Sequence, residues 1–459
     1  MAEKQRTVNS ITEGVIWKQL LRFFFPLLLG TFFQQLYNTV DTIVVGRFVG
    51  KTALAAVGVT GVIANLTIGL FTGLASGAVV IIAQYYGARE NEKVSKSVHT
   101  AMMMAVACGT IFMVAGILLT PWALRTIHTP DNAVEEATLY LRIFFLGMIP
   151  NAIYNMGTGV LRAIGDSRRP LYFLIVASLC NIVLDLVLVV GFGMGVDGAA
   201  IATVASQVLS AVLVVLSLSK SEGASYQLFF KELRIYGFLL ADIIKIGLPA
   251  ALQSLMYSSS NIVIQAVING FGTDAVAAWT AYSKAEMIMW MSTNALSLAL
   301  TTFVGQNYGA GEFGRVKKSV RIAAGMGAGI TVSLSLFMFL CARPLLGIFT
   351  PDAEVLEIGV EITRFLAPVF ITYVMVELLP GAVRGAGKSL VPMLISVFGI
   401  CVLRLAWLLI VVPQHHTITM VCASYPITWT ITSVAMLIYY RFGGWLKTRK
   451  ETHPASDKA

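Results

Sequence analysis

Charged residues are scarce in this sequence: Asp, Glu, Lys and Arg make up only 12% of its 459 residues. Soluble domains carry about twice that share, so a chain with a polar surface on every side is excluded. Hydrophobic residues make up 57%, in runs of about 20 residues or more, which is the length of a helix that crosses a bilayer. A closed barrel is excluded too, because its strands are short and give only a weak apolar signal. The composition predicts an all-α polytopic membrane protein.

Cysteine and histidine are few as well, and their spacing excludes most metal chemistry. The chain has five of each, with no CxxC pair and no histidine next to a cysteine. We therefore expect packing thiols rather than disulfides or metal ligands. The sequence also has no phosphate-binding loop and no nucleophile triad, so we expect neither an enzyme nor a protein that needs a cofactor. The cysteines lie in or beside apolar runs, at Cys108, Cys180, Cys341, Cys401 and Cys422.

Twelve apolar runs are long enough to span a membrane, and the charges between them predict its orientation. The N-terminus, every second loop and the C-terminal tail carry 25 of the 33 Lys and Arg, whereas the loops on the other side carry four. By the positive-inside rule, both termini face the cytoplasm of a bacterial-type inner membrane. The net charge of +9 is thus a topology signal, and no nucleic-acid partner is expected. The predicted spans are roughly 17–46, 52–84, 91–120, 133–162, 168–192, 196–219, 241–270, 274–306, 315–345, 353–384, 388–412 and 417–441.

The chain repeats itself at a fixed spacing of 222 residues. QYYGARENEKVSKSV (84–98) aligns with QNYGAGEFGRVKKSV (306–320) with nine identities in fifteen positions, and GVLRAIGDSRRP (159–170) aligns with GAVRGAGKSLVP (381–392). Each half holds six spans, an even number, so both halves have the same orientation. The expected relation is a pseudo-twofold axis along the membrane normal, with a site between the halves. The predicted parts are an N-terminal lobe (1–219), a cytoplasmic linker (220–240), a C-terminal lobe (241–441) and a cytoplasmic tail (442–459).

Asp41 and Asp185 lie inside predicted spans, where a carboxylate is costly and marks a functional site by default. Asn181 is four residues before Asp185, so the two share a helical face. The alternative is that both acids only pack helices, through hydrogen bonds to Asn or Tyr. A polar stripe along the first span leads to Asp41, and it consists of Thr31, Gln34, Tyr37 and Asn38.

The second half lacks this acidic pair. Under the repeat, Trp407 takes the place of Asp185, and Leu403 takes the place of Asn181. Glu377 is a candidate for a substrate cavity instead, with an interlobe hydrogen bond as the alternative. Flexible methionines suit a permissive drug pocket, although such residues more often face lipid. The further candidates for the cavity are Tyr257, Met287 and Met291.

Taken together, these features resemble the multidrug and toxic compound extrusion (MATE) family over nearly the whole chain. The match rests on the two six-span halves, the VDTIVVGRFVG stretch (40–50), the paired QxYGA segments, and the paired LRAIGDSRRP and VRGAGKS segments. The placement of the acids is most similar to the DinF-like and archaeal branch. There, an Asp in the first span, an Asn and an Asp in the fifth and a Thr in the sixth gather in the N-terminal lobe. The matching residues here are Asp41, Asn181, Asp185 and Thr203, whereas the acid of the NorM-like branch is replaced by Tyr257.

The resemblance implies the export of bulky cationic or amphipathic organic compounds against an inward proton or sodium gradient, by alternating access between two lobes. Pro26 matches a first-span proline where that helix is thought to bend, and proline removes a backbone hydrogen bond in any case. Two neighbouring, partly desolvated carboxylates titrate as a coupled pair, so one of them can hold a proton near neutrality and exchange it for a cation. Oxygens of Asn181 and Thr203 would complete a sodium site with Asp41 and Asp185.

Other functions also suit a membrane protein of this length. A flippase for a lipid-linked precursor would belong to the same superfamily, but such proteins usually have more spans and a more cationic cavity. An intramembrane enzyme would need a nucleophile or a metal constellation, which the sequence does not contain. A channel fits two unequal halves less well than alternating access does. We expect a monomer in the lipid bilayer that moves small organic molecules.

Overall fold

In the computed structural model, which describes residues 11–126 and 131–446, every regular element of these residues is helical. This follows from the apolar composition, because a segment inside lipid must satisfy its own backbone N–H and C=O groups. The elements of the first half are α1 (Ile16–Val44), a π-helical segment (Val45–Val49), α2 (Lys51–Gly87), α3 (Asn91–Thr126), α4 (Asp131–Leu146), α5 (Met148–Ala163), α6 (Arg168–Asp185), a second π-helical segment (Leu186–Gly191) and α7 (Gly195–Ser219).

The second half repeats this plan after a short 3-10 turn (Phe230–Glu232). Its elements are α8 (Gly237–Asn269), α9 (Thr273–Gly309), α10 (Phe313–Leu340), α11 (Ala342–Leu346), α12 (Ala353–Leu366), a 3-10 segment (Ala367–Thr372), α13 (Tyr373–Gly385), α14 (Leu390–Ser396), a π-helical segment (Val397–Val402), α15 (Leu403–Ile410) and α16 (Ile418–Phe442).

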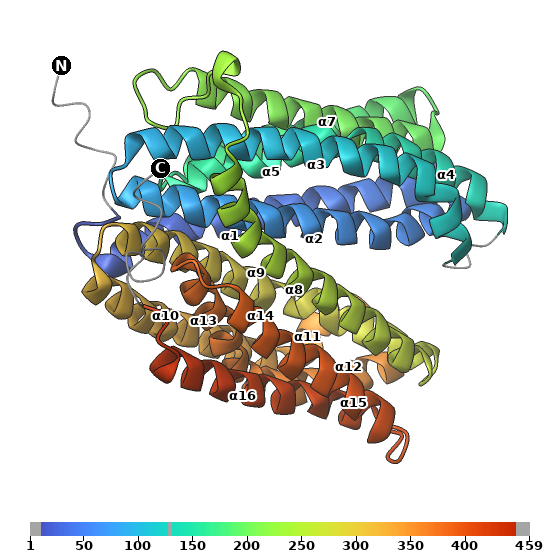
Figure 1. Cartoon of the computed structure of the whole chain (residues 1–459). Helices are drawn as coiled ribbons and strands as arrows, with labels where there is room; N and C mark the ends of the chain where they lie inside the picture. Colours follow the sequence, from blue (N-terminus) through green and yellow to red (C-terminus); the bar gives the residue numbers. More distant parts are fainter. Residues whose placement is uncertain (1–10, 127–130, 447–459) are drawn as a thin grey trace. The chain divides into compact units, whose positions relative to one another are not determined.

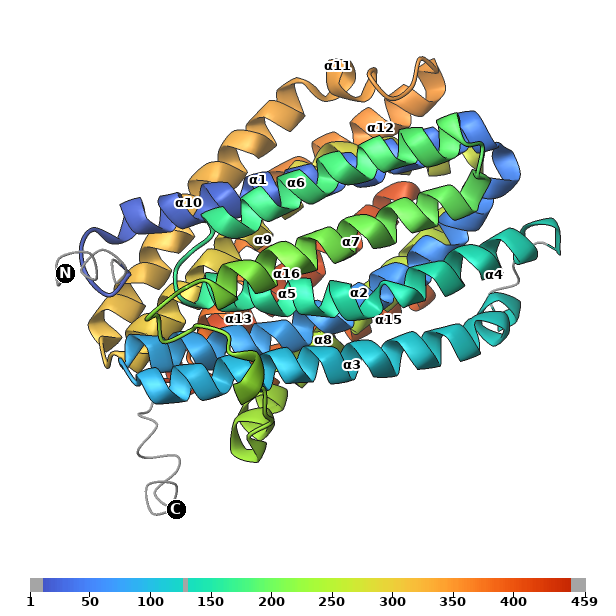
Figure 2. The ribbon, with the colours of Figure 1, turned by 90° about the horizontal axis from the view of Figure 1, so that it is seen from above.

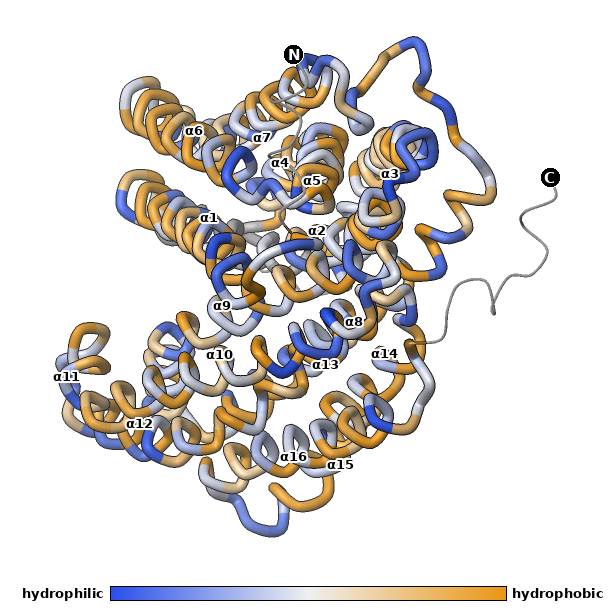
Figure 3. The backbone as a smooth tube through the Cα atoms, turned by 90° about the vertical axis from the view of Figure 1, so that its left-hand side faces the viewer, coloured by the Kyte–Doolittle hydropathy of each residue, from blue (hydrophilic) through white to orange (hydrophobic). Residues whose placement is uncertain are grey.

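Eleven helical segments of the described residues are long and apolar enough to cross a membrane, and the number is twelve if the bent pair α4 and α5 is taken as one span. Figure 3 shows hydrophobic residues along the helices, with hydrophilic stretches gathered at their ends and connections. The predicted fold class, an all-α polytopic membrane protein, is therefore confirmed.

The fourth span of each half is interrupted at the same place. In the first half, Val134–Leu146 and Met148–Ala163 meet at an angle of 46°, with Gly147 between them. A Cβ atom at Gly147 would displace the end of the flexible Gln207 side chain on α7, whose Oε1 would lie 2.4 Å away. In the second half, the equivalent stretch is the 3-10 segment Ala367–Thr372.

The chain forms two compact units whose boundaries do not coincide with the sequence repeat. The first unit runs from Arg22 to Ala251, and the second joins the described residues up to Leu21 to those from Leu252 onward. The first turns of α1 therefore belong to the second unit, and the first turns of α8 belong to the first. The lobe boundaries at 219 and 241 stay a prediction from the repeat, and residues 1–10 and 447–459 lie outside the described residues.

Within the first unit, α3 packs against α5, α5 against α7, and α7 against α6 (Figures 1 and 2). Its hydrophobic core extends to the start of α8, because Leu239, Ile243 and Ile246 are buried in it. Apolar side chains thus explain why these turns of α8 belong to this unit.

The predicted linker (220–240) also packs onto the first unit. The backbone N–H of Phe229 donates to Nε2 of His99 at 3.1 Å, and that of Tyr236 donates to Oγ1 of Thr100 at 3.2 Å. Both acceptors lie near the start of α3. The linker's last residues, from Gly237, already belong to α8, and within 220–236 the regular structure is limited to the 3-10 turn.

In the second unit, α13 packs against both α9 and α16. The indole of Trp429 on α16 is fully buried and lies 4.9 Å from the ring of Phe370 and 5.2 Å from that of Tyr373, between ring centroids. Along α9, the hydroxyls of Ser297 and Thr301 donate to backbone carbonyls of α13, each at 3.0 Å. Aromatic packing and hydroxyl bonds together fix α13 in this unit.

Gly385 faces the backbone of α9, and this gives a prediction about stability. A Cβ atom there would lie 2.6 Å from the carbonyl oxygen of Thr301 and 2.9 Å from Cβ of Val304. Backbone cannot yield as a flexible side chain does, so we expect Gly385→Ala to destabilise the protein by about 1–3 kcal/mol, measured as a lower melting temperature in detergent. Gly329→Ala on α10 is the control, since a Cβ there has open space and alanine favours helix. An equal loss in both variants would contradict the packing argument.

Candidate ion-coupling site

Two acidic residues of the first unit lie where α-helices give way to π-helical segments. Asp41 precedes the segment Val45–Val49 by one helical turn, and Asp185 is the last residue of α6, directly before Leu186–Gly191. The two π-helical segments pack against each other. Such segments are rare and often occur at functional sites. The sequence predicted both acids but not this change of helix type.

The acidic pair and Asn181 are buried, and their polar atoms are not satisfied. Asn181 and Asp185 are 0% exposed, and Asp41 is 8% exposed. Both oxygens of Asp185, Oδ1 of Asp41 and both amide atoms of Asn181 have no hydrogen-bond partner among the described residues. Leaving a buried polar atom unsatisfied costs about 1–3 kcal/mol, so native proteins contain few such atoms. Unpaired carboxylate and amide oxygens of this kind are able to bind a proton or a hard cation.

The two carboxyl groups, one on α1 and one on α6, lie close enough to interact electrostatically. Neither forms a salt bridge with a basic side chain of the described residues. Tyr37 on α1 and Tyr140 on α4 both lie close enough to interact with the two carboxylates. Two uncompensated charges in a low-dielectric space are costly, so this arrangement favours binding of a positive charge.

Of these neighbours, Tyr140 was missed by the sequence analysis. It lies on the fourth span, four residues after Glu136 and therefore on the same helical face, a spacing that could have singled it out. Thr203, which was predicted, is buried on α7, the helix that packs along α6. It therefore lies on the element next to Asn181 and Asp185.

The polar stripe of α1 is only partly brought to the acidic pair. Tyr37 is half-buried and lies near the carboxylates, whereas Gln34 and Asn38 are exposed. Thr31 is half-buried and donates to the backbone carbonyl of Leu27 at 3.0 Å. Of the stripe predicted from helical spacing, Tyr37 thus lies near the acidic pair, whereas Gln34 and Asn38 are exposed.

Pro26 lies inside α1, which stays helical through it. Proline has no N–H, so the backbone carbonyl of Arg22, four residues earlier, has no helical N–H to accept from. The boundary between the two units passes through α1 between Leu21 and Arg22. The backbone hydrogen bond that proline removes would thus have begun at Arg22, next to the boundary between the two units.

In the second unit, Glu377 belongs to a hydrogen-bonded network. It accepts from the hydroxyl of Tyr373 at 2.9 Å and lies close enough to interact with the side chain of Tyr257. The side-chain amide of Gln253 donates to the Tyr257 hydroxyl at 3.1 Å and accepts from the guanidinium of Arg384 at 3.1 Å. Tyr257 and Glu377 were predicted together; Tyr373, Gln253 and Arg384 were not.

The helical spacing of Tyr373, Glu377 and Arg384 could have revealed part of this network, since residues four and seven apart share a face. The two predicted methionines lie on α9, with Met291 buried and Met287 half-buried. Neither makes a hydrogen bond in the described part of the chain, so they contribute shape rather than polarity.

A second buried ionic cluster was also missed. Glu286 on α9 is 9% exposed and interacts with Tyr282 and Trp290, one turn before and one turn after it. Arg404 is 3% exposed, interacts electrostatically with Glu286, and stacks on Tyr425 with 4.2 Å between the guanidinium carbon and the ring centroid. Both residues lie within predicted spans, 274–306 and 388–412, and neither was a candidate site residue.

Metal ligands of the common types do not gather in the described residues. Within 11–126 and 131–446, no group of three or more His, Cys, Asp or Glu side chains is placed to hold a metal ion. The five cysteines, all within these ranges, are free thiols. The oxygens of the acidic pair and of the Asn181 amide nevertheless suit a hard cation such as sodium.

Comparisons with known proteins give a consistent family. The MatE family model matches residues 26–187 and 249–410, one match in each half. The chain is 28% identical over 438 residues to a Bacillus subtilis (strain 168) protein named probable multidrug resistance protein YoeA, covering 93% of this chain and 94% of that protein. It is 25% identical over 358 residues to a Shewanella oneidensis protein named FAD transporter, covering 76% and 78%.

Solved structures share the fold. A MOP superfamily transporter from Pyrococcus furiosus superposes with a TM-score of 0.89 at 23% identity, covering 96% of this chain and 99% of that one. A multidrug resistance MATE family transporter in an outward-facing conformation gives a TM-score of 0.88 at 23% identity, covering 95% and 98%. At this level of identity the likeness concerns the fold alone.

Proposed function

This chain belongs to the MatE family of membrane transporters, and on that premise we propose that it exports organic compounds in exchange for an inward-moving proton or sodium ion. Its relatives are transporters rather than enzymes. The proposed substrates are bulky cationic or amphipathic compounds, as in multidrug efflux. The chain works as a monomer in a bacterial-type inner membrane with both termini in the cytoplasm, and its closer likeness to the DinF-like branch stays a prediction.

The observation that carries the proposal is the group of unsatisfied polar atoms at Asp41, Asn181 and Asp185. They are buried, they face no basic side chain of the described residues, and two of the three can carry a negative charge. A purely structural role would be expected to pair these atoms with neighbours. The same atoms suit reversible binding of a positive charge.

The acidic pair supports a simple exchange cycle. With a proton or sodium ion bound, the net charge of the pair falls and the buried site becomes less costly. After the ion leaves, the pair favours a state in which water reaches it again. Pro26 supplies a weak point in α1 through which such a change can reshape the site. The coupling ion would be held by Asp41 and Asp185, with oxygens from Asn181 and Thr203.

Substrate selection is assigned to the second unit. Glu377 is half-buried beside Tyr257 and Tyr373, and a carboxylate next to aromatic rings suits an organic cation. Met287 and Met291 on α9 would add an adaptable apolar surface. A flippase for a lipid-linked precursor is the less favoured alternative, since the buried acids of the first unit would oppose an anionic headgroup.

Transport in proteoliposomes tests the proposal. Purified protein is reconstituted with a fluorescent cationic dye, and a proton gradient or a sodium gradient is imposed separately. We expect dye movement against its own gradient with at least one of the two ions. Dye movement that needs neither ion would contradict coupled antiport, and the ion that drives movement identifies the coupling species.

A prediction about the ion concerns Asn181. If its amide oxygen helps to hold sodium, Asn181→Ala should reduce or abolish the rise in melting temperature that sodium causes, while proton-driven transport is less affected. Asn155→Ala on α5 is the matched control, because Asn155 is a half-buried Asn of the same unit that already bonds to Asn151. Absence of any sodium effect in the parent protein would point to protons alone.

A further inference from the structure

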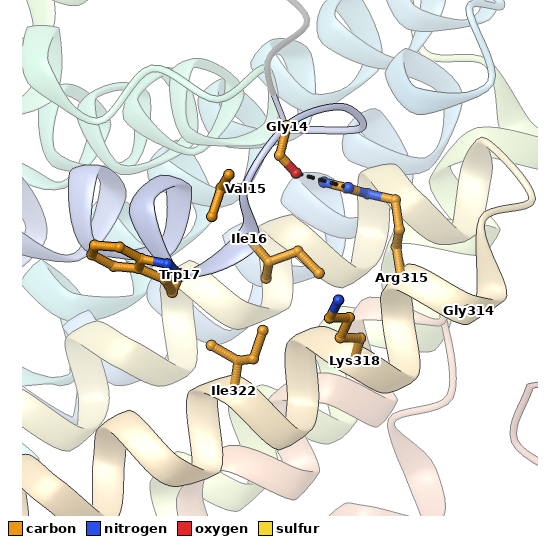
Figure 4. A pocket seen from close by; sticks show the side chains of 8 residues that line it. All are labelled: Gly14, Val15, Ile16, Trp17, Gly314, Arg315, Lys318 and Ile322. Atoms are coloured by element: carbon orange, nitrogen blue, oxygen red, sulfur yellow. Dashed lines mark hydrogen bonds between the residues drawn. The ribbon is translucent and has the colours of Figure 1, made fainter.

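A hollow of about 360 Å³ lies within the second unit, where the first turn of α1 meets the start of α10 (Figure 4). Apolar side chains form much of its rim, and Val15 and Trp17 are 51% and 48% exposed there. Lys318 extends from α10 toward the hollow, between Ile16 and Ile322. The site is thus apolar at its edges and basic on its α10 side.

Arg315, also on α10, holds the N-terminal turn that forms the opposite wall of the hollow. Its guanidinium donates to the backbone carbonyls of Ile11 at 3.1 Å, Glu13 at 3.3 Å and Gly14 at 3.0 Å, and to the amide oxygen of Asn307 at 3.0 Å. These acceptors, and the amide oxygen of Gln19 at 3.4 Å, are all neutral oxygens. The bonds therefore hold the N-terminal turn in place without cancelling the positive charge of Arg315.

The sequence repeat shows what is unusual about Lys318. Its counterpart in the first half is Lys96, which forms a salt bridge with Glu92 one helical turn earlier. At the position of Glu92, the second half has Gly314. Lys318 therefore lacks the counter-ion that the repeat would supply, and within 11–126 and 131–446 it forms no salt bridge.

The same replacement also makes room. Gly314 lines the hollow, and a Cβ atom there would meet nothing within 4 Å. On the first half, the linker covers the equivalent surface, with Lys96 lying 5.6 Å above the ring of Tyr236. The glutamate-to-glycine difference thus removes a charge partner, and the surface that the linker covers in the first half is exposed here at Gly314 and Lys318.

We propose that this hollow binds the phosphate group of an anionic glycerophospholipid. The hollow lies at the helix ends that the charge pattern predicts to be cytoplasmic, and a partly exposed Trp17 is typical of the membrane–water interface. Basic hollows between helices on the cytoplasmic side suit anionic headgroups. Lys318 faces the phosphate and Arg315 adds a positive charge nearby, while Val15, Trp17 and Ile322 contact the glycerol and the first acyl carbons.

Lipid binding is tested with the purified full chain in detergent, using native mass spectrometry and thermal melts. The probes are phosphatidylglycerol, phosphatidylethanolamine with the same acyl chains, and inorganic phosphate. We expect phosphatidylglycerol to bind and to raise the melting temperature more than the other two. Gly314→Glu and Lys318→Glu should each weaken its binding about fivefold or more, the effect of one basic residue near an anionic lipid surface.

Lys96→Ala is the matched control, because Lys96 is the repeat equivalent that already pairs with Glu92, and it should bind phosphatidylglycerol as the parent does. Gly314→Glu restores the first-half ion pair, so it should keep or raise the melting temperature without lipid, which separates lost binding from lost folding. Equal binding of phosphatidylethanolamine would overturn the headgroup assignment. Full protection by inorganic phosphate would overturn the lipid assignment, and equal loss in the Lys96 variant would overturn the site.

Discussion

Asp41→Asn and Asp185→Asn should each leave the protein folded and inserted but abolish gradient-driven efflux. Asparagine has nearly the same shape as aspartate, but its amide neither takes up nor releases a proton and offers no negative charge to a cation. Since neither carboxylate pairs with a basic side chain of the described residues, the substitution strands no buried positive charge. Removing an unpaired buried charge is neutral or stabilising, so we expect an unchanged or higher melting temperature.

Transport of a dye in proteoliposomes under an imposed gradient measures this effect, and drug resistance of cells at matched protein levels supports it. Asp274→Asn is the control, because Asp274 is exposed in the first turn of α9, and its loss should leave transport intact. Full gradient-driven efflux by either site variant would remove the acidic pair from the coupling machinery. Loss of dye binding together with loss of folding would instead indicate a structural role.

The burial of Asp41 and Asp185 was predictable from the sequence, because a carboxylate inside a long apolar run is easy to recognise and its burial costs free energy. A carboxylate in a run of apolar residues stands out, and the spacing of Asn181 and Asp185 places them on one face of a helix. The twelve apolar runs and the 222-residue repeat likewise indicated the fold class. These signals depend only on composition and local periodicity, which do not need a folded structure to be read.

Features that arise from contacts between distant segments were not predictable. Tyr140 comes near the acidic pair only through the packing of α4 against α2 and α7 in the first unit. The π-helical segments after Asp41 and Asp185 have no fixed sequence signal. The start of α1 joins the second unit through bonds from Arg315 to backbone carbonyls, and a carbonyl acceptor has no side chain to reveal it.

The hydrogen-bonded network around Glu377 in the second unit was also only partly predictable from the sequence. The spacing of Tyr373 and Glu377 predicts one shared face, but Gln253 on α8 joins them only through the folded structure. The asymmetry between halves was predictable, because Trp407 replaces Asp185 and Leu403 replaces Asn181. From that asymmetry we expect ion coupling to depend on the first unit and substrate choice to depend on the second.

Glu377→Gln should change which substrates are exported while leaving the ion response in place. Glu377 is half-buried and hydrogen-bonded to the Tyr373 hydroxyl. If its charge pairs directly with an organic cation, its removal should cost about 2–5 kcal/mol of binding free energy for cationic substrates. Neutral amphipathic substrates make no such pair, so their export should continue.

The test is a panel of cationic and neutral dyes, with each variant run under proton and sodium gradients. Tyr373→Phe keeps the charge of Glu377 and removes only one hydrogen bond, so we expect it to weaken cation export less than Glu377→Gln does. Glu354→Gln, an exposed acid in the first turn of α12, should behave as the parent. If Glu377→Gln stops every dye and also abolishes the ion response, the second unit takes part in coupling, and the division of roles between Asp41 and Glu377 is wrong.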